Sequence, residues 1–345
     1  MQAAKIIVAV AAMLLAAGAV QGQAINIQTV PVGNPGNAPD TRVMDDGSSG
    51  YGAVSYSYNI GKYLVTAGQY TAFLNAVGGV DTYGLYNHYM ANTNIGNTSG
   101  SGITQSGGGT VGNPFTYSVD PNFANRPVNF VNYWDSCRFA NWLSNNQPTG
   151  AQGPGTTETG AYTLNGYDGN DGHSIQRNAN ATWAVANEDE WYKAAYYDPN
   201  HNGGTGGYWL YPTRSNTAPG NDMNDISGNN ANYYASQSFP IDSPYYTTVV
   251  GQFKNSASTY GTFDQCGNVW EWNDTTTGSF RGQRGGSYDI PNASWLSATH
   301  RYTTYPLNFS SYIGFRVVEV PEPGTLSIFA LCLAGGLIKQ KGLLR

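Results

Sequence analysis

The chain has 345 residues, with 44 glycines and 26 tyrosines, and only 11% of its residues are charged. A hydrophobic content of 40% is sufficient for a substantial core, so one folded domain with processed ends is the simplest interpretation. The net charge of −6 offers no electrostatic basis for binding nucleic acid, while the abundance of Gly and Tyr is typical of loop-rich folds that display tyrosine.

The N-terminus has the pattern of a secretory signal peptide. A single basic residue, Lys5, precedes an apolar run over residues 6–19, and small residues follow at Gly22 and Ala24. We therefore expect residues 1–24 to direct export and to be removed. The next residues, up to about 50, are rich in Gly, Asn, Pro and Asp and are expected to form an irregular start to the folded domain.

Three places in the chain have the pattern of a capping box. In this motif a polar side chain at the helix start and an amide or carboxylate side chain three residues later each accept a hydrogen bond from the other's backbone N–H. The first helix is expected to run through Ala76, and the third to end before Pro199. The three pairs are Thr66 with Gln69, Asn132 with Asp135, and Asn187 with Glu190.

The rest of the chain consists of turns and short extended segments. Short strands are predicted at 208–212, 231–234 and 247–251, between stretches dense in Gly, Asn, Ser and Thr. Few helices and many short strands indicate an α+β domain dominated by loops.

One extended motif stands out, Gly267-Asn268-Val269-Trp270-Glu271-Trp272. Side chains alternate along a strand, so both tryptophans are expected on one face and Glu271 on the other. A buried carboxylate needs a cation, an arginine or backbone amides as partner.

The cysteines permit little covalent cross-linking. The predicted folded region contains Cys137 and Cys266, whereas Cys332 lies in the C-terminal tail, so at most one disulfide can form in the domain. Cys137 lies on the second predicted helix and is expected in the core. No cluster of Cys and His has the spacing of an ordinary zinc site.

The C-terminus combines a Pro-Glu-Pro segment with an apolar run and a basic end. The run over residues 326–338 has about 13 residues, where a membrane span needs about 20, so it suits a transient anchor. Residues 320–345 resemble the PEP-CTERM sorting tail of exported bacterial proteins. The resemblance implies an exosortase-type processing enzyme as a partner; an ordinary short anchor is the alternative, and both place the protein at the cell envelope, cell surface or outside the cell.

Six short motifs follow one another along the chain. They are Leu64-Val65-Thr66, Arg126-Pro127-Val128, Glu188-Asp189-Glu190-Trp191, the segment 267–272, Arg284-Gly285-Gly286-Ser287 and Gly314-Phe315-Arg316. In this order they resemble the sulfatase-modifying factor, or formylglycine-generating-enzyme-like, domain, over about residues 40–319. The resemblance implies an α+β fold of the C-type-lectin-like kind, loop-rich with short strands and a few short helices, for the domain at 25–319.

The resemblance fails where the family's oxidases perform their chemistry. In that branch two cysteines, five residues apart, bind copper and activate oxygen, but the matching positions here are Ile290 and Trp295. Neither side chain supplies the thiolate that Cu(I) requires, so copper is not expected. We therefore predict a binding module without catalysis; a divergent oxidoreductase that oxidises a protein cysteine is the alternative.

The resemblance also implies two structural calcium sites, built from the hard oxygen ligands that calcium takes. The first would use the side chains of Asn232 and Asp242 and the carbonyls of Tyr233 and Pro244. The second would use the Glu271 side chain and the carbonyls of Asp264, Gly267 and Val269. A salt bridge from Glu271 to Arg284, Arg301 or Arg316 is the alternative for the second site.

The segment between Gly286 and Gly314 is where the resemblance implies a ligand groove. Tyr, Asn and Trp side chains give amphipathic contacts suited to a polysaccharide or a protein ligand, although these aromatics could instead pack the domain. The candidate residues are Tyr288, Asp289, Asn292, Trp295, His300, Arg301, Tyr302, Tyr305, Asn308 and Tyr312.

Overall fold

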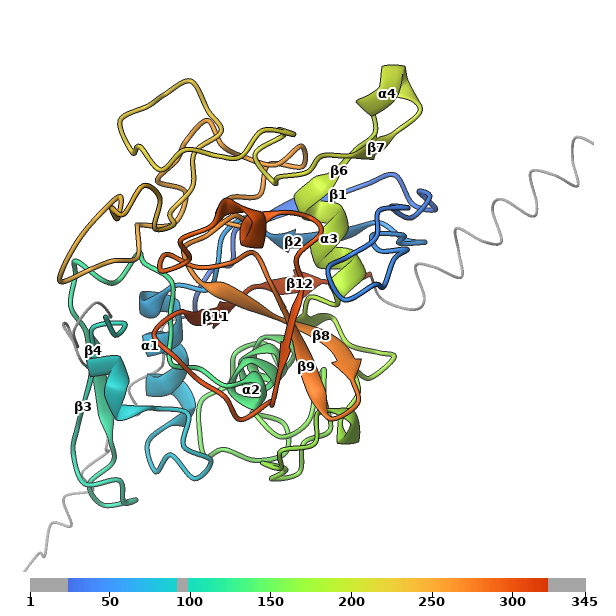
Figure 1. Ribbon diagram of the computed structural model, residues 1–345. Helices are drawn as coiled ribbons and strands as arrows, with labels where there is room; N and C mark the ends of the chain where they lie inside the picture. The colour runs from blue at the N-terminus through green and yellow to red at the C-terminus, as the bar shows by residue number, and fades with distance from the viewer. Residues whose placement is uncertain (1–23, 92–98, 322–345) are drawn as a thin grey trace, which may run out of the picture.

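The computed structural model describes residues 24–91 and 99–321 (Figure 1). The predicted signal peptide, apart from Ala24, and the predicted sorting tail from residue 322 onward lie outside the described residues. In the two described ranges, no helix combines the length and apolar character needed to cross a membrane.

Two four-stranded sheets form the centre of the molecule. The first is wholly antiparallel, with the order β1-β2-β12-β5. The second has the order β10-β9-β8-β11, in which only the β8–β11 pair is parallel. The strands are β1 (Thr29–Val32), β2 (Tyr58–Gly61), β5 (Trp183–Val185), β8 (Trp270–Thr277), β9 (Phe280–Arg284), β10 (Tyr302–Thr304), β11 (Ile313–Phe315) and β12 (Val317–Glu319).

Helices and two small hairpins surround these sheets. The α-helices are α1 (Ala67–Val77), α2 (Tyr133–Ser144), α3 (Glu188–Tyr196) and the short α4 (His201–Gly204). The hairpins pair β3 (Ile103–Ser106) with β4 (Thr116–Val119), and β6 (Tyr197–Asp198) with β7 (Gly207–Tyr208). Single turns of 3-10 helix lie at His88–Ala91, Gly172–Ser174 and Ala293–Leu296. Short strands with few short helices confirm the predicted α+β character.

The three predicted capping boxes are all present. Thr66, Asn132 and Asn187 each accept a hydrogen bond from the backbone N–H three residues later, and the side chain there accepts one from the N-cap backbone in return. The first helix ends at Val77, one residue beyond the prediction, and the third ends at Tyr196, before Pro199. Local side-chain chemistry therefore determines where these helices start.

Helices α1 and α2 pack through their aromatic residues. The rings of Phe73 and Phe139 meet edge-on at 5.3 Å, and Phe139 also meets Phe315 of β11 at 5.4 Å. All of these side chains are buried in the main hydrophobic cluster. The core therefore connects the helices to the second sheet.

The predicted strands after α3 are only partly present. The segment 208–212 contributes one residue to β7, while 231–234 and 247–251 have no strand (yellow to orange in Figure 1). In 231–234 the backbone bonds separate backbone groups of other loops, such as those of Gly220 and Ile290, and in 247–251 side chains supply some of the partners. The Asn268 side chain, for example, accepts from the Thr248 N–H at 3.1 Å and donates to the Thr248 carbonyl at 3.3 Å.

A single residue, Arg316, separates β11 of the second sheet from β12 of the first. Its guanidinium bonds both carboxylate oxygens of Glu271 on β8, at 2.5 and 2.7 Å, and also donates to the Gly61 and Phe263 carbonyls. Trp191 of α3 donates to Glu271 at 2.7 Å. Among the three candidate arginines, Arg316 is therefore the salt-bridge partner of Glu271.

Replacing Arg316 by Leu is expected to lower the free energy of unfolding by about 3–5 kcal/mol, because it leaves a fully buried carboxylate without its cation. Lys254→Leu serves as the control. Lys254 is an exposed cation, so its loss should cost less than about 1 kcal/mol. Urea unfolding followed by fluorescence measures both; equal effects of the two substitutions would contradict the central role of Arg316.

Candidate functional site

A small cavity of about 270 Å³ lies beside β8, β9 and β10, where the chain after β9 returns past the sheet. It collects side chains from these strands and from the segment that leads into β10 and β11. Its lining is Trp270, Gln283, Asp289, Ile290, Trp295, Tyr302, Thr304, Asn308, Tyr312 and Ile313. We call this cavity the groove.

A continuous row of aromatic rings forms one side of the groove. Trp295 stacks on His300 with centroids 5.1 Å apart and an interplanar angle of 10°. His300 lies 5.6 Å from Trp270, and Trp270 lies 5.9 Å from Tyr302. The two ends of the row are exposed, Trp295 by 44% and Tyr302 by 50%, whereas Trp270 is 5% exposed. Two exposed rings are therefore held in place by buried ones.

Polar side chains also face this cavity. Gln283 is 1% exposed, and its Nε2 has no hydrogen-bond partner among the described residues. Asp289 accepts a hydrogen bond from Ser287 Oγ at 2.5 Å, and burial raises the pKa of the Asp289 carboxyl although that hydrogen bond acts to lower it. The groove thus holds an unused amide donor and a carboxylate acceptor.

The arginine and histidine side chains near the groove each contact carboxylates of the domain. Arg301 bonds both oxygens of Glu188, at 3.0 and 2.8 Å, and Asp46 at 2.6 Å. Arg284 is fully buried and donates to Glu188 at 2.8 Å. His300 Nδ1 lies 2.7 Å from Asp45. Among the described residues that line the groove, Asp289 is the only one of Asp, Glu, His, Lys or Arg.

The structure brings part of the predicted ligand surface together. Asp289, Trp295 and Tyr302 line the groove, as do Asn308 and Tyr312. Their side chains come from one continuous stretch of the chain after β9, which is why the sequence could indicate them.

The other predicted residues lie elsewhere. Tyr288 is fully buried and donates to Ser311 Oγ at 3.0 Å, Asn292 caps the 3-10 helix, and Tyr305 is exposed against Phe280. His300 and Arg301 support the groove from behind through the contacts described above. Trp270, Gln283, Thr304 and Ile313 line it without having been proposed as ligand residues. The strand register that pairs Gln283 with Tyr302 has no local sequence signal.

The two positions that match the family's cysteines, Ile290 and Trp295, both line the groove. The cysteines of the described domain, Cys137 and Cys266, are free and buried, and burial raises the pKa of both thiols. Neither lines the groove, so no described thiol is placed for copper or oxygen chemistry there.

The first implied calcium position contains an unsatisfied ligand. Asn232 is 1% exposed, and its Oδ1 has no hydrogen-bond partner among the described residues. Its Nδ2 donates to the Tyr246 carbonyl at 3.0 Å and to Asn268 Oδ1 at 3.1 Å, which fixes the orientation of the amide. A buried oxygen without a donor suits a hard cation, so the Asn232 side chain fits a calcium ligand.

The second implied calcium position already has a cation. Arg316 and Trp191 together make three hydrogen bonds to the Glu271 carboxylate, out of about four that it can accept. Calcium would have to share this carboxylate with a guanidinium, so the donor set fits it poorly. No group of three or more His, Cys, Asp or Glu side chains with metal-binding geometry occurs in the described parts of the chain.

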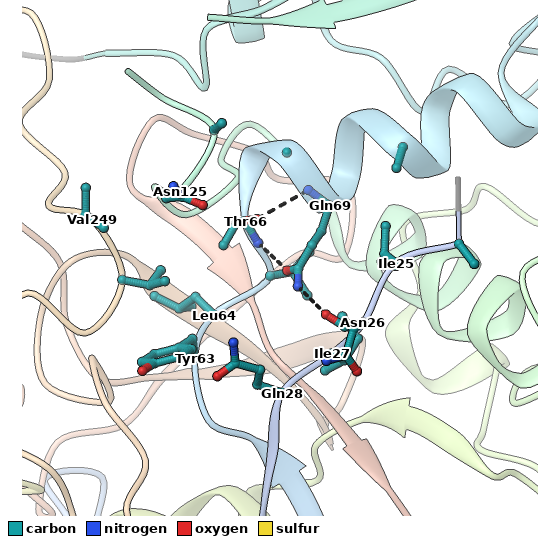
Figure 2. A pocket seen from close by; sticks show the side chains of 16 residues that line it. Ile25, Asn26, Ile27, Gln28, Tyr63, Leu64, Thr66, Gln69, Asn125 and Val249 are labelled. Carbon is teal, nitrogen blue, oxygen red and sulfur yellow. Dashed lines mark hydrogen bonds between the residues drawn. The ribbon is translucent and has the colours of Figure 1, made fainter. Parts of the chain in front are cut away.

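A second cavity, of about 700 Å³, lies at the start of α1 (Figure 2). One wall is the extended chain 25–28, held by a 3.0 Å hydrogen bond from Gln69 Nε2 to the Asn26 carbonyl. Aliphatic residues such as Leu64 and Val249 form much of the rest. The described residues that line it include no Asp, Glu, His, Cys, Lys or Arg, and its hydroxyl groups are those of Tyr63 and Thr66.

Comparisons with known proteins agree with this geometry. The sequence profile of the Sulfatase-modifying factor enzyme 1-like domain matches residues 36–320. Curated protein sequences give no significant match.

Three solved structures are among those to which the chain is similar. The crystal structure of CarF has 18% identity and a TM-score of 0.50, over 86% of this chain and 99% of that one. Treponema denticola variable protein 1 has 18% identity and a TM-score of 0.48, over 85% and 95% of the two chains. PvdO from Pseudomonas aeruginosa has 17% identity and a TM-score of 0.41, over 85% and 91%. At this identity the likeness to CarF concerns the fold alone.

We expect both domain thiols to be inert in the native protein, because burial excludes reagents and disfavours the thiolate. The test uses a Cys332→Ser variant, which removes the tail cysteine, and a coloured thiol-specific reagent. The native protein should give no rapid reaction, and the protein unfolded in guanidinium should give two thiols per chain, Cys137 and Cys266. Fast native labelling, or fewer than two thiols after unfolding, would contradict this assignment.

Proposed function

Because the chain belongs to the sulfatase-modifying factor enzyme 1-like family, we propose that it is an exported binding module without catalytic activity. Its ligand would be a polysaccharide or a protein at the cell surface or in the extracellular matrix. The observation that carries the proposal is the groove. Its lining combines exposed aromatic rings and an unsatisfied amide with Ile290 and Trp295, the two positions that match the family's cysteines.

The groove supports binding because its contact groups are prepared in advance. His300 and Trp270 hold the rings of Trp295 and Tyr302, so little side-chain entropy is lost when a ligand stacks on them. The Nε2 of Gln283 already lacks a partner, so a ligand acceptor that reaches it removes an existing desolvation penalty.

The absence of catalysis is supported by the side chains at the matching cysteine positions. Ile290 is 6% exposed and Trp295 is an aromatic surface residue, and neither can bind Cu(I) or exchange electrons as a thiolate does. Asp289 remains as an acidic group, but a lone carboxylate provides no redox centre. The alternative, a divergent oxidoreductase that oxidises a protein cysteine, requires another source of that chemistry.

Export is supported by sequence alone. Residues 1–24 would direct secretion and residues 320–345 would form the PEP-CTERM tail, anchored transiently and processed by an exosortase-type enzyme. The family profile, which ends at residue 320, does not extend over this tail. The location at the envelope, the surface or outside the cell therefore belongs to the proposal.

Calcium is proposed as a structural ion at the first position only. Asn232 and Asp242 would supply side-chain oxygens there, with the carbonyls of Tyr233 and Pro244, and the ion would fix the long loops that precede β8. The unpartnered Oδ1 of Asn232 supports this assignment. Copper has no comparable support.

Trp295→Ala and Tyr302→Ala are each expected to abolish retention of the protein on columns of glycan or extracellular matrix, because each removes an exposed end of the aromatic row. Trp183→Ala is the matched control, since Trp183 is partly exposed but lines a different cavity. Retention that survives both groove substitutions, with folding verified by circular dichroism, would refute the groove as the binding site.

An activity assay on the same purified protein distinguishes a binding module from an oxidoreductase that oxidises a protein cysteine. It is incubated with copper, oxygen and a peptide carrying a sulfatase-type cysteine motif, and the peptide mass is followed. We expect the cysteine to remain unchanged; clear loss of the thiol with turnover would establish the oxidoreductase instead.

Removal of calcium is expected to lower the melting temperature by several degrees, since an ion bound only to the native state stabilises it. Metal analysis should find calcium in the purified protein. Asn232→Ala should lose both the ion and the response to a chelator. Asn75→Ala, whose side chain bonds only the Tyr117 backbone, should keep both. Calcium content unaffected by Asn232→Ala would contradict the assignment of the ligand.

A further inference from the structure

We propose that the groove takes a neutral glycan chain, with Trp295 and Tyr302 as two stacking subsites. This inference rests on the proposed binding function and specifies its ligand. It is carried by three observations: the two exposed ends of one aromatic row, the polar groups of the groove with the unpaired Gln283 amide among them, and the absence of a cation among the described residues that line the groove.

The aromatic row provides flat surfaces at fixed orientations. One face of Trp295 is covered by the nearly parallel ring of His300, which leaves the ring otherwise open, and Trp295 is 44% exposed. Tyr302 is 50% exposed and contacts Trp270 at 5.9 Å. A sugar ring has apolar C–H faces that pack on such surfaces, and two rings at the two ends of one row favour a ligand of more than one unit.

The polar groups of the groove match hydroxyls. Gln283 Nε2 needs an acceptor, and Asp289 can accept further hydrogen bonds besides that from Ser287. Asn308 donates to Thr304 Oγ1 and is itself exposed, so its amide oxygen can accept. A hydroxyl both donates and accepts, so the closely spaced hydroxyls of a sugar can satisfy this mixture of groups.

The charges exclude an acidic ligand. Arg301 is committed to Glu188 and Asp46, and Arg284 is buried against Glu188. Among the described residues that line the groove, Asp289 is the only acidic or basic one. When its carboxyl is ionised it repels uronic acid, sulfate or phosphate groups, and when protonated it still offers them no cation. A neutral chain pays no such electrostatic cost.

The exposed surface continues beyond the groove, which suits a polymer. Tyr305 and Phe309, which follow β10, are 44% and 45% exposed, and Tyr305 is held by the edge of Phe280 at 4.6 Å.

A peptide added to a sheet edge is recognised mainly through its main chain. The unsatisfied group here is a side chain inside the groove, which favours the glycan over a peptide.

The experiment is isothermal titration calorimetry of the full chain with three probes. They are neutral glucose- or mannose-based oligosaccharides of one to six units, uronic acid oligosaccharides of the same lengths, and a neutral peptide library. We expect binding of at least one neutral series, with affinity that rises from one unit to about three or four and no binding of the acidic series. Trp295→Ala and Tyr302→Ala should each weaken it about tenfold or more, and Trp183→Ala should leave it unchanged.

The outcomes separate this inference from the binding function itself. If a peptide binds in a Trp295-dependent way and no glycan binds, the neutral-glycan inference is wrong but the proposed binding function stands. A preference for the acidic series would have the same meaning. Binding of none of the three probes would overturn both. A Trp295→Phe variant, which keeps a flat ring and disturbs folding least, should retain a large part of the neutral-glycan affinity; if it binds no better than Trp295→Ala, stacking is not the basis of recognition.

Discussion

The buried ion pair between Glu271 and Arg316 is the interaction on which the two sheets depend. Arg316 is the single residue between β11 and β12, and these strands belong to different sheets. Because its guanidinium also bonds carbonyls at Gly61 and Phe263, it joins β2, the loop before β8, and β8 itself. A charge pair without solvent contact tolerates little displacement, so it sets how the two sheets meet.

This arrangement also positions the groove. Glu271 lies between Trp270, which lines the groove, and Trp272, which is fully buried in the core and donates to the Val131 carbonyl. The strand that carries the ion pair therefore presents one tryptophan to the groove and another to the core. Asp45 and Asp46 contact His300 and Arg301 from some 255 residues earlier in the chain. The irregular N-terminal segment thus supports the residues beside the groove directly.

Much of the scaffold could be predicted from the sequence because its signals are local. A capping box lies within four residues, so Thr66, Asn132 and Asn187 indicated the helix starts correctly. The predicted strands at 231–234 and 247–251 are absent because their backbone groups bond scattered partners and not one neighbouring strand. In 231–234 these partners are backbone groups such as those of Gly220 and Ile290, and in 247–251 they include the Asn268 side chain. For the same reason the sequence left three arginines open as partners of Glu271. The sequence did not predict that Gln283 lines the groove, because its position depends on strand register and on burial. Neither of these leaves a local sequence pattern.

The complete pairing of Arg284 and Arg301 with Glu188 and Asp46 has a consequence for how this domain can change. The groove side chains at Trp295 and Tyr302 are largely exposed and carry none of the buried ion pairs, so replacing them should cost little folding free energy. The residues that stabilise the fold are thus separate from those proposed to recognise a ligand. A library that randomises the ligand-facing positions while keeping the arginine pairs fixed should therefore yield folded proteins of new specificity, with the domain serving as an adaptable display framework.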